Sequence, residues 1–149
     1  MPRETRETLD PQGVLAGTTC LVTGGAGFVG SHVVELLLDA GAAEVRVIDN
    51  MVRGRRDNLS RALASNRVRL IEGDIRDKDC LSKAFAEYKP VAVMHFAALA
   101  LVGPSLTDPG AYYDVNVVGT LRLLEVMRDA RIDNLVFSST CAVYGEPPR

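Results

Sequence analysis

The sequence predicts an α/β fold in which five parallel strands form one doubly wound sheet with helices on both faces. Short apolar runs alternate with segments of helical period along the chain, which is typical of a parallel sheet joined by right-handed crossovers. Three glycines follow the first apolar run, and the second run ends in an acidic residue, Asp49. The expected strand order is 3-2-1-4-5, with a ligand site at the switch between the first and fourth strands.

The glycine segment has the context of a dinucleotide-binding turn. An apolar strand, residues 20–22, is followed by Gly24, Gly27 and Gly30 and then by a helical apolar pattern that includes Val29 and Leu36. This order of strand, turn and helix is the one that binds pyrophosphate. The three glycines serve the tight turn, the approach of a pyrophosphate to the backbone and close packing of the helix, in that order. The helix N-terminus then offers free N–H groups and a positive dipole end.

Asp49 strengthens this interpretation. It ends the second strand and lies 19 residues after Gly30, close to the roughly 20 expected for the acid that binds an adenosine ribose. A glycine turn without ligand and a solvated carboxylate are the alternatives. Three arginines follow and offer charges for a 2′-phosphate or for a solvated loop: Arg53, Arg55 and Arg56. Because Asp49 repels a 2′-phosphate, NAD is predicted rather than NADP.

The remaining elements are predicted from periodicity and capping residues. Residues 1–17 are expected to be a loose leader, and residues 18–149 the NAD-binding domain. The later elements are a short helix over 57–64 with Asp57 as N-cap, a strand over 68–72, a helix from Asp77 to about Tyr88, a strand over 91–96, a loop over 99–107, a long helix over 110–130 with Asp108 as N-cap and Pro109 at its first position, and a strand over 134–138.

Ligands of such sheets lie outside the carboxyl ends of the strands. After the third strand, Asp74 is predicted to accept a hydrogen bond from an adenine amino group, and Ile75 to cover a ring face. After the fourth strand, the small residues Ala97 and Ala98 leave room for a flat cofactor. Turn formation and ordinary helix–sheet packing are the alternatives for these residues.

Three residues near these exits have structural interpretations. His95 lies on an apolar strand and is predicted to be a core residue with satisfied hydrogen bonds rather than a base. Asn116 lies inside the long helix, where a buried amide needs partners, and the loop after the fourth strand is one candidate. Gly119 costs about 1 kcal/mol against alanine in a helix, which indicates a close backbone approach.

Composition limits the remaining function classes. The 149 residues are enough for one domain, and 47% are hydrophobic. The net charge of −2 gives no reason to expect nucleic acid or an anionic membrane as partner, and no apolar run is long enough to cross a bilayer. The three cysteines form neither a zinc pattern nor a disulfide framework, so a reducing cytoplasm and no metal are expected. Apolar residues on several sides of the 110–130 helix suggest a homodimer contact or burial within the same protein.

These motifs together resemble the extended short-chain dehydrogenase/reductase superfamily. Within it the chain is most similar to the UDP-glucose 4-epimerase family and other nucleotide-sugar epimerases of the NAD-dependent epimerase/dehydratase group. The motifs that carry the resemblance are residues 23–30, Asp49-Asn50, Gly73-Asp74-Ile75, His95-Phe96-Ala97-Ala98, Tyr112-Tyr113-Asp114, residues 116–120 and residues 138–145.

The resemblance implies a Rossmann-type domain and an isomerase of galactose metabolism that acts on a UDP-sugar. NAD takes a hydride from sugar C4 and returns it to the opposite face of a 4-keto intermediate. Thr140 is implied as the catalytic hydroxyl that donates to the sugar 4-oxygen. The predicted cofactor-binding residues are Gly24, Gly27, Phe28, Val29, Gly30, Asp49, Asn50, Asp74, Ile75, Phe96, Ala97, Ala98, Asn116 and Ser138.

The chain also departs from the family pattern. The family's catalytic base belongs to a Tyr-x-x-x-Lys pair, and none of the four tyrosines in these 149 residues has a lysine four positions later. We therefore expect a fragment, truncated before the sixth strand and the substrate domain, that is inactive alone. An NAD-binding module and a remnant without catalysis are the alternatives. Ala100 replaces a common lysine, and Val115 a frequent asparagine.

Related dehydratases and decarboxylases are a further alternative. Dehydratases commonly carry an Asp-Glu pair after the Ser/Thr position, because removal of water needs an acid and a base, and decarboxylases often keep the Glu. This chain has Cys141 and Ala142 there. Neither side chain transfers those protons, which favours epimerisation.

Overall fold

The structure is a computed structural model that describes residues 15–86, 89–140, 143 and 145. Its five strands are β1 (Thr19–Thr23), β2 (Glu44–Asp49), β3 (Val68–Glu72), β4 (Ala92–His95) and β5 (Leu135–Phe137). They form one sheet in the order β3-β2-β1-β4-β5, and all four pairs are parallel. The predicted fold class and strand order are therefore confirmed.

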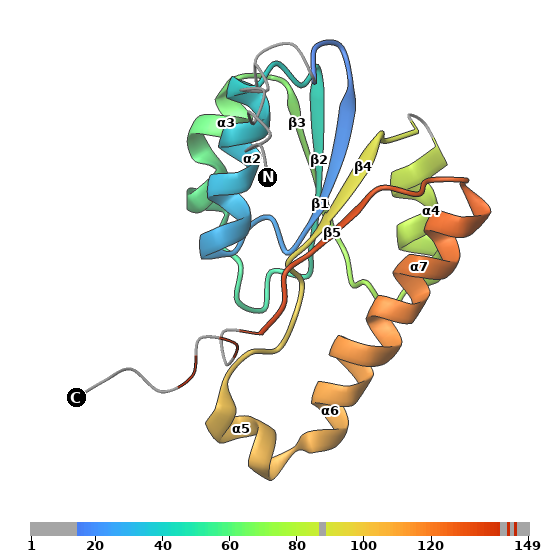
Figure 1. Ribbon diagram of the computed structural model, residues 1–149. Helices are drawn as coiled ribbons and strands as arrows, with labels where there is room; N and C mark the ends of the chain where they lie inside the picture. Colours follow the sequence, from blue (N-terminus) through green and yellow to red (C-terminus); the bar gives the residue numbers. More distant parts are fainter. Residues whose placement is uncertain (1–14, 87–88, 141–142, 144, 146–149) are drawn as a thin grey trace, which may run out of the picture.

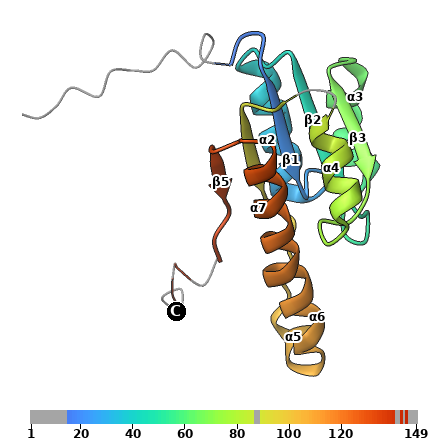
Figure 2. The same cartoon turned by 90° about the vertical axis from the view of Figure 1, so that its right-hand side faces the viewer.

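Helices cover both faces of the sheet (Figure 1). On one face lie α2 (Phe28–Asp39), the 3₁₀ turn η1 (Arg56–Leu59) and α3 (Ser60–Ala64), and on the other lie α4 (Lys78–Ala86) and α7 (Thr120–Asp129). A helical arm of α5 (Val102–Thr107), α6 (Pro109–Tyr113) and the π-turn η2 (Asp114–Gly119) extends past the carboxyl edge of the sheet (Figure 2). The described residues include no helix that is long and apolar enough to span a membrane.

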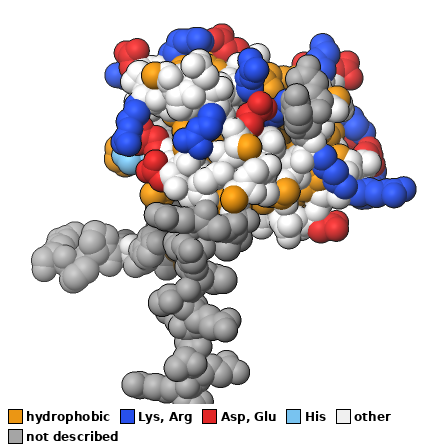
Figure 3. Space-filling view, turned by 90° about the horizontal axis from the view of Figure 1, so that it is seen from above, with side chains coloured by type: hydrophobic (Ala, Val, Ile, Leu, Met, Phe, Trp, Pro, Cys, Tyr) orange, Lys and Arg blue, Asp and Glu red, His pale blue; other side chains and the backbone are white. Residues whose placement is uncertain are grey.

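The hydrophobic core has two parts, one on each face of the sheet. Alternate residues of β1 point to opposite sides, so Cys20 and Val22 pack with α2 and α3, whereas Leu21 packs with α4 and α7. Helices cover both faces of the sheet, which explains why these strands are apolar at nearly every position. The opposite, amino-terminal edge of the sheet shows basic and acidic side chains interspersed with small hydrophobic patches (Figure 3).

One charged side chain lies inside the α4 side of the core. Arg46 is 3% exposed, and its Nε donates to Glu44 Oε1 at 2.8 Å while Nη1 donates to the Ala84 carbonyl at 2.9 Å. The guanidinium therefore links β2 to the last turn of α4.

Several predicted boundaries differ from the structure. Asp57 is not an N-cap, because the chain first makes a 3₁₀ turn whose cap position is Arg55. The Arg55 N–H donates to the Ala26 carbonyl at 3.0 Å, and this tether holds the segment close to the glycine turn. The loop predicted over 99–107 contains α5, in which Pro104 falls within the first turn, where a missing N–H costs nothing.

The ends of the domain also differ from the prediction. Residues 15–17 belong to the ordered domain, since Leu15 packs on the core and Ala16 forms an antiparallel bridge with Ala42; the rest of the predicted leader, residues 1–14, lies outside the described residues. The long helix exists as α6, η2 and α7 in succession, with Asp108 as its N-cap as predicted.

Candidate functional site

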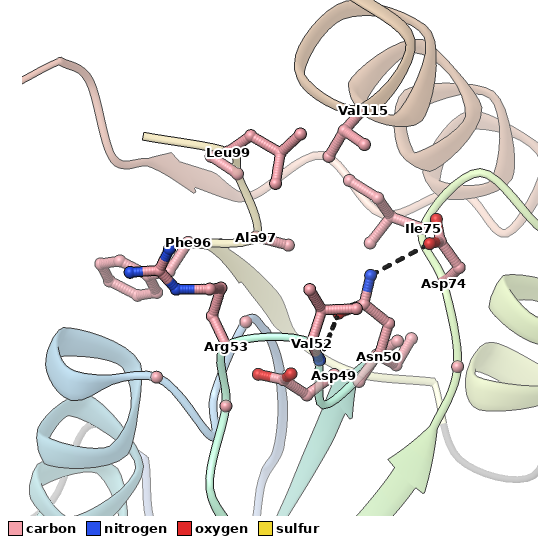
Figure 4. A pocket seen from close by; sticks show the side chains of 16 residues that line it. Asp49, Asn50, Val52, Arg53, Asp74, Ile75, Phe96, Ala97, Leu99 and Val115 are labelled. Atoms are coloured by element: carbon pink, nitrogen blue, oxygen red, sulfur yellow. Dashed lines mark hydrogen bonds between the residues drawn. The ribbon is translucent and has the colours of Figure 1, made fainter. Parts of the chain in front are cut away.

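A pocket opens at the carboxyl edge of the sheet, where β1, β2, β3 and β4 end (Figure 4). Residues predicted to bind a cofactor form much of its lining, namely Gly24, Gly27, Asp49, Asn50, Asp74, Ile75, Phe96, Ala97 and Ala98. The structure adds Ile48, Val52, Arg53, Gly54, Gly73, Leu99 and Val115 to the lining. The strand-exit rule therefore located the pocket, and the added residues are chain neighbours of the predicted ones or belong to η2.

The glycine turn is built so closely that side chains are excluded at two positions. Gly24 has φ +70°, and a Cβ there would lie 2.5 Å from the Ala97 nitrogen. A Cβ at Gly30 would collide with the Gly24 carbonyl oxygen and lie 2.8 Å from Gly25 Cα. These contacts explain why the turn needs glycine between β1 and β4 and why α2 packs against it.

Gly27 is less crowded than the other two glycines, because a Cβ there would make one tight contact rather than a collision. Its backbone is extended, with φ −73° and ψ 174°, and it is the N-cap of α2. Only the Gly24 carbonyl oxygen, at 3.2 Å, lies near the position of a Cβ. Gly27 thus lies in the pocket lining at the positive end of the α2 dipole.

Asp49 connects the glycine turn to the loop after β2. Asp49 is 7% exposed. Its Oδ2 accepts a hydrogen bond from the Ala26 N–H at 3.0 Å, and its Oδ1 accepts one from the Met51 N–H at 2.9 Å. A carboxylate has about four acceptor positions, so two remain for a ligand hydroxyl. Its place at the tip of β2 fits the predicted ribose contact.

Asp74 is more fully engaged than the sequence suggested. Oδ1 accepts from the Arg76 backbone N–H and from Arg76 Nε, both at 2.9 Å, while Oδ2 accepts from Arg76 Nη2 at 2.8 Å and Asn50 Nδ2 at 3.1 Å. The Arg76 guanidinium holds the pKa of this carboxyl well below its usual range. All four acceptor positions of the carboxylate are used. An adenine amino group would therefore have to displace Asn50 or Arg76 to donate to Asp74.

Arg76 was not identified from the sequence. It lies two residues after Asp74 and also donates from Nη1 to Asp114 Oδ2 at 2.6 Å. It therefore joins the exit of β3 to the start of η2 beside the pocket. The Asp-x-Arg spacing is the only sequence signal for the first of these contacts.

Five other predicted residues and the catalytic candidate do not line the pocket. Phe28 and Val29 are exposed on the first turn of α2, at 79% and 55%, and Gly30 lies beneath the turn. Ser138 and Thr140 are exposed after β5. Asn116 lies behind the wall and bonds the backbone of Leu99, so the predicted partner in the loop after the fourth strand is confirmed.

His95 is a satisfied core residue, as predicted. It is 3% exposed, with Nδ1 2.5 Å from Thr23 Oγ1 and Nε2 2.9 Å from Thr120 Oγ1. Burial lowers the pKa of the imidazole to about 4, because the charged form is poorly solvated there. In the described residues no three His, Cys, Asp or Glu side chains are grouped to hold a metal ion.

The low pKa of His95 makes folding stability depend on pH. The unfolded chain binds a proton near pH 6.5, whereas the folded chain binds it only near pH 4, so stability is present at high pH and is lost as the pH falls. We expect the free energy of unfolding to fall by about 2 kcal/mol between pH 8 and pH 5 from this group, measured by urea unfolding. The His95→Gln variant should lose this slope, and His32→Gln, at an exposed site, should keep it; equal slopes in both would contradict the assignment.

Comparisons with known proteins give the family. The family model for GDP-mannose 4,6 dehydratase matches residues 21–149. The chain is 47% identical over 133 residues to the UDP-glucose 4-epimerase of Rhizobium leguminosarum bv. trifolii, which covers 89% of this chain and 38% of the relative. The chain thus spans little more than a third of the length of the curated relatives it matches.

Solved structures agree with the sequence relatives. The UDP-glucose 4-epimerase of Bifidobacterium longum in complex with NAD⁺ and UDP has a TM-score of 0.80 and 40% identity, covering 89% of this chain and 40% of that one. The Brucella ovis enzyme in complex with NAD has a TM-score of 0.77 and 44% identity, covering 89% and 39%. With its glycine turn, strand order and family match, this chain belongs to the NAD-dependent epimerase/dehydratase family of the extended short-chain dehydrogenases/reductases.

Proposed function

We propose that this chain binds NAD at the carboxyl edge of its sheet and is the cofactor-binding part of a nucleotide-sugar 4-epimerase of the UDP-glucose/UDP-galactose type. The observation that carries the proposal is the convergence of four strand exits on one pocket whose lining includes Gly27 at the N-terminus of α2. The NAD complexes of similar epimerases support the choice of cofactor.

Each part of the pocket suits one part of the dinucleotide. Gly27 and the N-terminus of α2, with its N–H groups and partial positive charge, would hold the pyrophosphate. The Asp49 carboxylate accepts from the adenosine ribose. Ile75 contacts a ring face, and the small side chains of Ala97 and Ala98 leave the space for a flat ring. Arg53 adds a positive charge to the lining, and Val115 makes the wall beside η2 apolar.

In the complete reaction NAD would supply the hydride acceptor. Thr140, exposed beyond β5, is the proposed donor to the sugar 4-oxygen. Because none of the 149 residues forms a Tyr-x-x-x-Lys pair, we infer that the chain alone holds NAD without turning over UDP-galactose. A nucleotide-binding module is therefore the second candidate function.

The dehydratase alternative is less well supported. The matching family model describes a dehydratase, but that reaction needs an acid and a base after the Ser/Thr position. Cys141 and Ala142 stand there; they lie outside the described residues, and neither side chain supplies such a pair.

The cellular setting is proposed on the same basis. A cytoplasmic location suits the UDP-sugar substrate. A homodimer through the 110–130 helix is supported by its exposed apolar side chains, because Val117, Leu121 and Leu124 are 47%, 53% and 41% exposed.

Charge placed at Gly27 tests the proposed pyrophosphate position. Gly27→Asp and Gly27→Asn have side chains of nearly equal size, and both are good N-caps at this extended position, so both variants should fold. The aspartate places a negative charge at the anion site. We expect it to bind NAD about 30-fold more weakly than the asparagine variant, a difference of about 2 kcal/mol, measured by isothermal titration calorimetry.

The parent chain and Gly103→Ala serve as controls for this comparison. Gly103 lies in α5 with nothing within 4 Å of a Cβ position, and its variant should bind NAD as the parent does. Equal affinities of the two Gly27 variants, or a parent chain that takes up no NAD, would refute the proposal.

A further inference from the structure

We propose that His95 and Thr120 are positioning residues that hold one wall of the pocket, through a directed chain of hydrogen bonds from β1 to Leu99. This series of hydrogen bonds passes through the π-turn η2. The inference concerns residues that do not line the pocket, and it uses the proposed function only in taking NAD as the ligand.

The series of hydrogen bonds joins four elements, β1, β4, α7 and η2. Thr23, at the end of β1, lies 2.5 Å from His95 Nδ1 at the end of β4. His95 Nε2 lies 2.9 Å from Thr120 Oγ1, at the start of α7. Thr120 Oγ1 donates to the Asn116 carbonyl at 2.7 Å. Thr23 and His95 are fully or almost fully buried, so water competes little for these bonds.

The direction of the chain follows from the donors available. The Thr120 hydroxyl has one hydrogen, and it is given to Asn116. Thr120 Oγ1 must then accept from His95 Nε2–H, which leaves Nδ1 unprotonated in the neutral ring. Thr23 Oγ1 is therefore the donor to Nδ1. The arrangement assigns the Nε2–H tautomer to His95 and requires a hydroxyl at position 120.

The hydroxyl of Thr120 also helps to form the π-turn. η2 has the hydrogen bonding of a π-helix rather than that of an α-helix. The Thr120 hydroxyl donates to the Asn116 carbonyl, which a regular α-helix would pair with the Thr120 backbone N–H. π-turns are rare and occur mostly at functional sites. Here the turn carries Val115 into the pocket lining and Asn116 toward Leu99.

The Asn116 side chain links the π-turn to the pocket wall at Leu99. Its Oδ1 accepts from the Leu99 N–H at 2.8 Å, and its Nδ2 donates to the Leu99 carbonyl at 2.9 Å. Leu99 and Val115 both line the pocket (Figure 4). Because this pair of bonds fixes the backbone of Leu99, loss of the Thr120 hydroxyl releases the wall without touching any residue that contacts the ligand.

The first experiment uses the protein without ligand. Thr120→Val removes the hydroxyl but keeps the shape, and Thr120→Ser restores the hydroxyl. We expect amide hydrogen exchange of Leu99 to become at least tenfold faster in Thr120→Val and to return in Thr120→Ser, while the amide of Val47 in the sheet stays protected in both. The ¹⁵N shifts of His95 should report the Nε2–H tautomer in the parent and in Thr120→Ser.

A second variant separates the wall from the imidazole. Asn116→Ser should release Leu99 to the same extent with the His95 tautomer unchanged, and it keeps the proposal testable if Thr120→Val does not fold. Unchanged Leu99 exchange in either folded variant, or a Nδ1–H tautomer in the parent, would overturn the proposal.

The binding experiment is independent of these readouts. NAD titrated into Thr120→Val should bind five- to tenfold more weakly than into the parent, and Thr120→Ser should recover most of the affinity. If Leu99 opens as expected but the parent binds no NAD, the proposed function fails and the positioning role stands. If NAD binds equally to all variants, the positioning role fails and the proposed function stands.

Discussion

Replacing Gly24 with alanine should lower the free energy of unfolding by about 4 kcal/mol. Two penalties add at this position. The left-handed backbone, with φ +70°, costs a residue with a Cβ about 1–2 kcal/mol. The Cβ also meets backbone atoms of Phe96 and Ala97 at 2.5–2.8 Å, and crowding of this kind costs about 1–3 kcal/mol. Urea unfolding followed by circular dichroism measures the change.

Two glycines of the same chain separate the two penalties. Gly17 has φ +74° with nothing within 4 Å of a Cβ, so Gly17→Ala carries only the backbone cost, about 1 kcal/mol. Gly103 has neither feature, and its alanine variant should be as stable as the parent or slightly more so. A Gly24→Ala protein no less stable than Gly17→Ala would show that the approach of the turn to β4 is not tight.

Replacing Arg46 with methionine should destabilise the chain by about 3–4 kcal/mol. Methionine fills much of the same volume but removes the 2.8 Å partner of Glu44 and the Nη1 donor to the Ala84 carbonyl. Removing one member of a buried ion pair costs about 3–5 kcal/mol. The exposure of Glu44, whose side chain is 21% accessible, places the expected loss toward the lower part of that range.

Arg69 provides the matched control for this substitution. Its Nε lies 3.9 Å from the other oxygen of the same Glu44, but its side chain is 73% exposed. Exposed ion pairs contribute little, so Arg69→Met should change stability by less than about 0.5 kcal/mol. Equal losses in the two variants would mean that burial does not determine the strength of the Arg46 contact.

The sequence predicted those features that depend on local patterns. The alternation of strands and helices predicted the strand order of the sheet. The spacing from Gly30 to Asp49 indicated that the glycine turn and Asp49 belong to one site, and both contribute to the pocket lining. The partner of Asn116 was also predicted, because an amide inside a helix has few alternatives to the facing loop.

Features that depend on distant contacts were not predicted. Beside the π-turn, the Thr120 hydroxyl contacts His95, 25 residues earlier in the chain, and no local period of the sequence predicts that contact. The apolar period of α2 does not by itself identify the buried face, since Leu36 is 65% exposed whereas Val34 is buried. Gly30 packs against the glycine turn, and this contact turns the face with Val34 toward the sheet.

The origin of the pocket lining has a kinetic consequence. Its walls come from segments as far apart as Gly24 and Val115, and the folded sheet, with β4 paired to β1, holds them together. We therefore expect partly folded states to lack the binding site, so that a nucleotide present during refolding stabilises only the native state. Such a ligand should lower the unfolding rate and leave the folding rate unchanged.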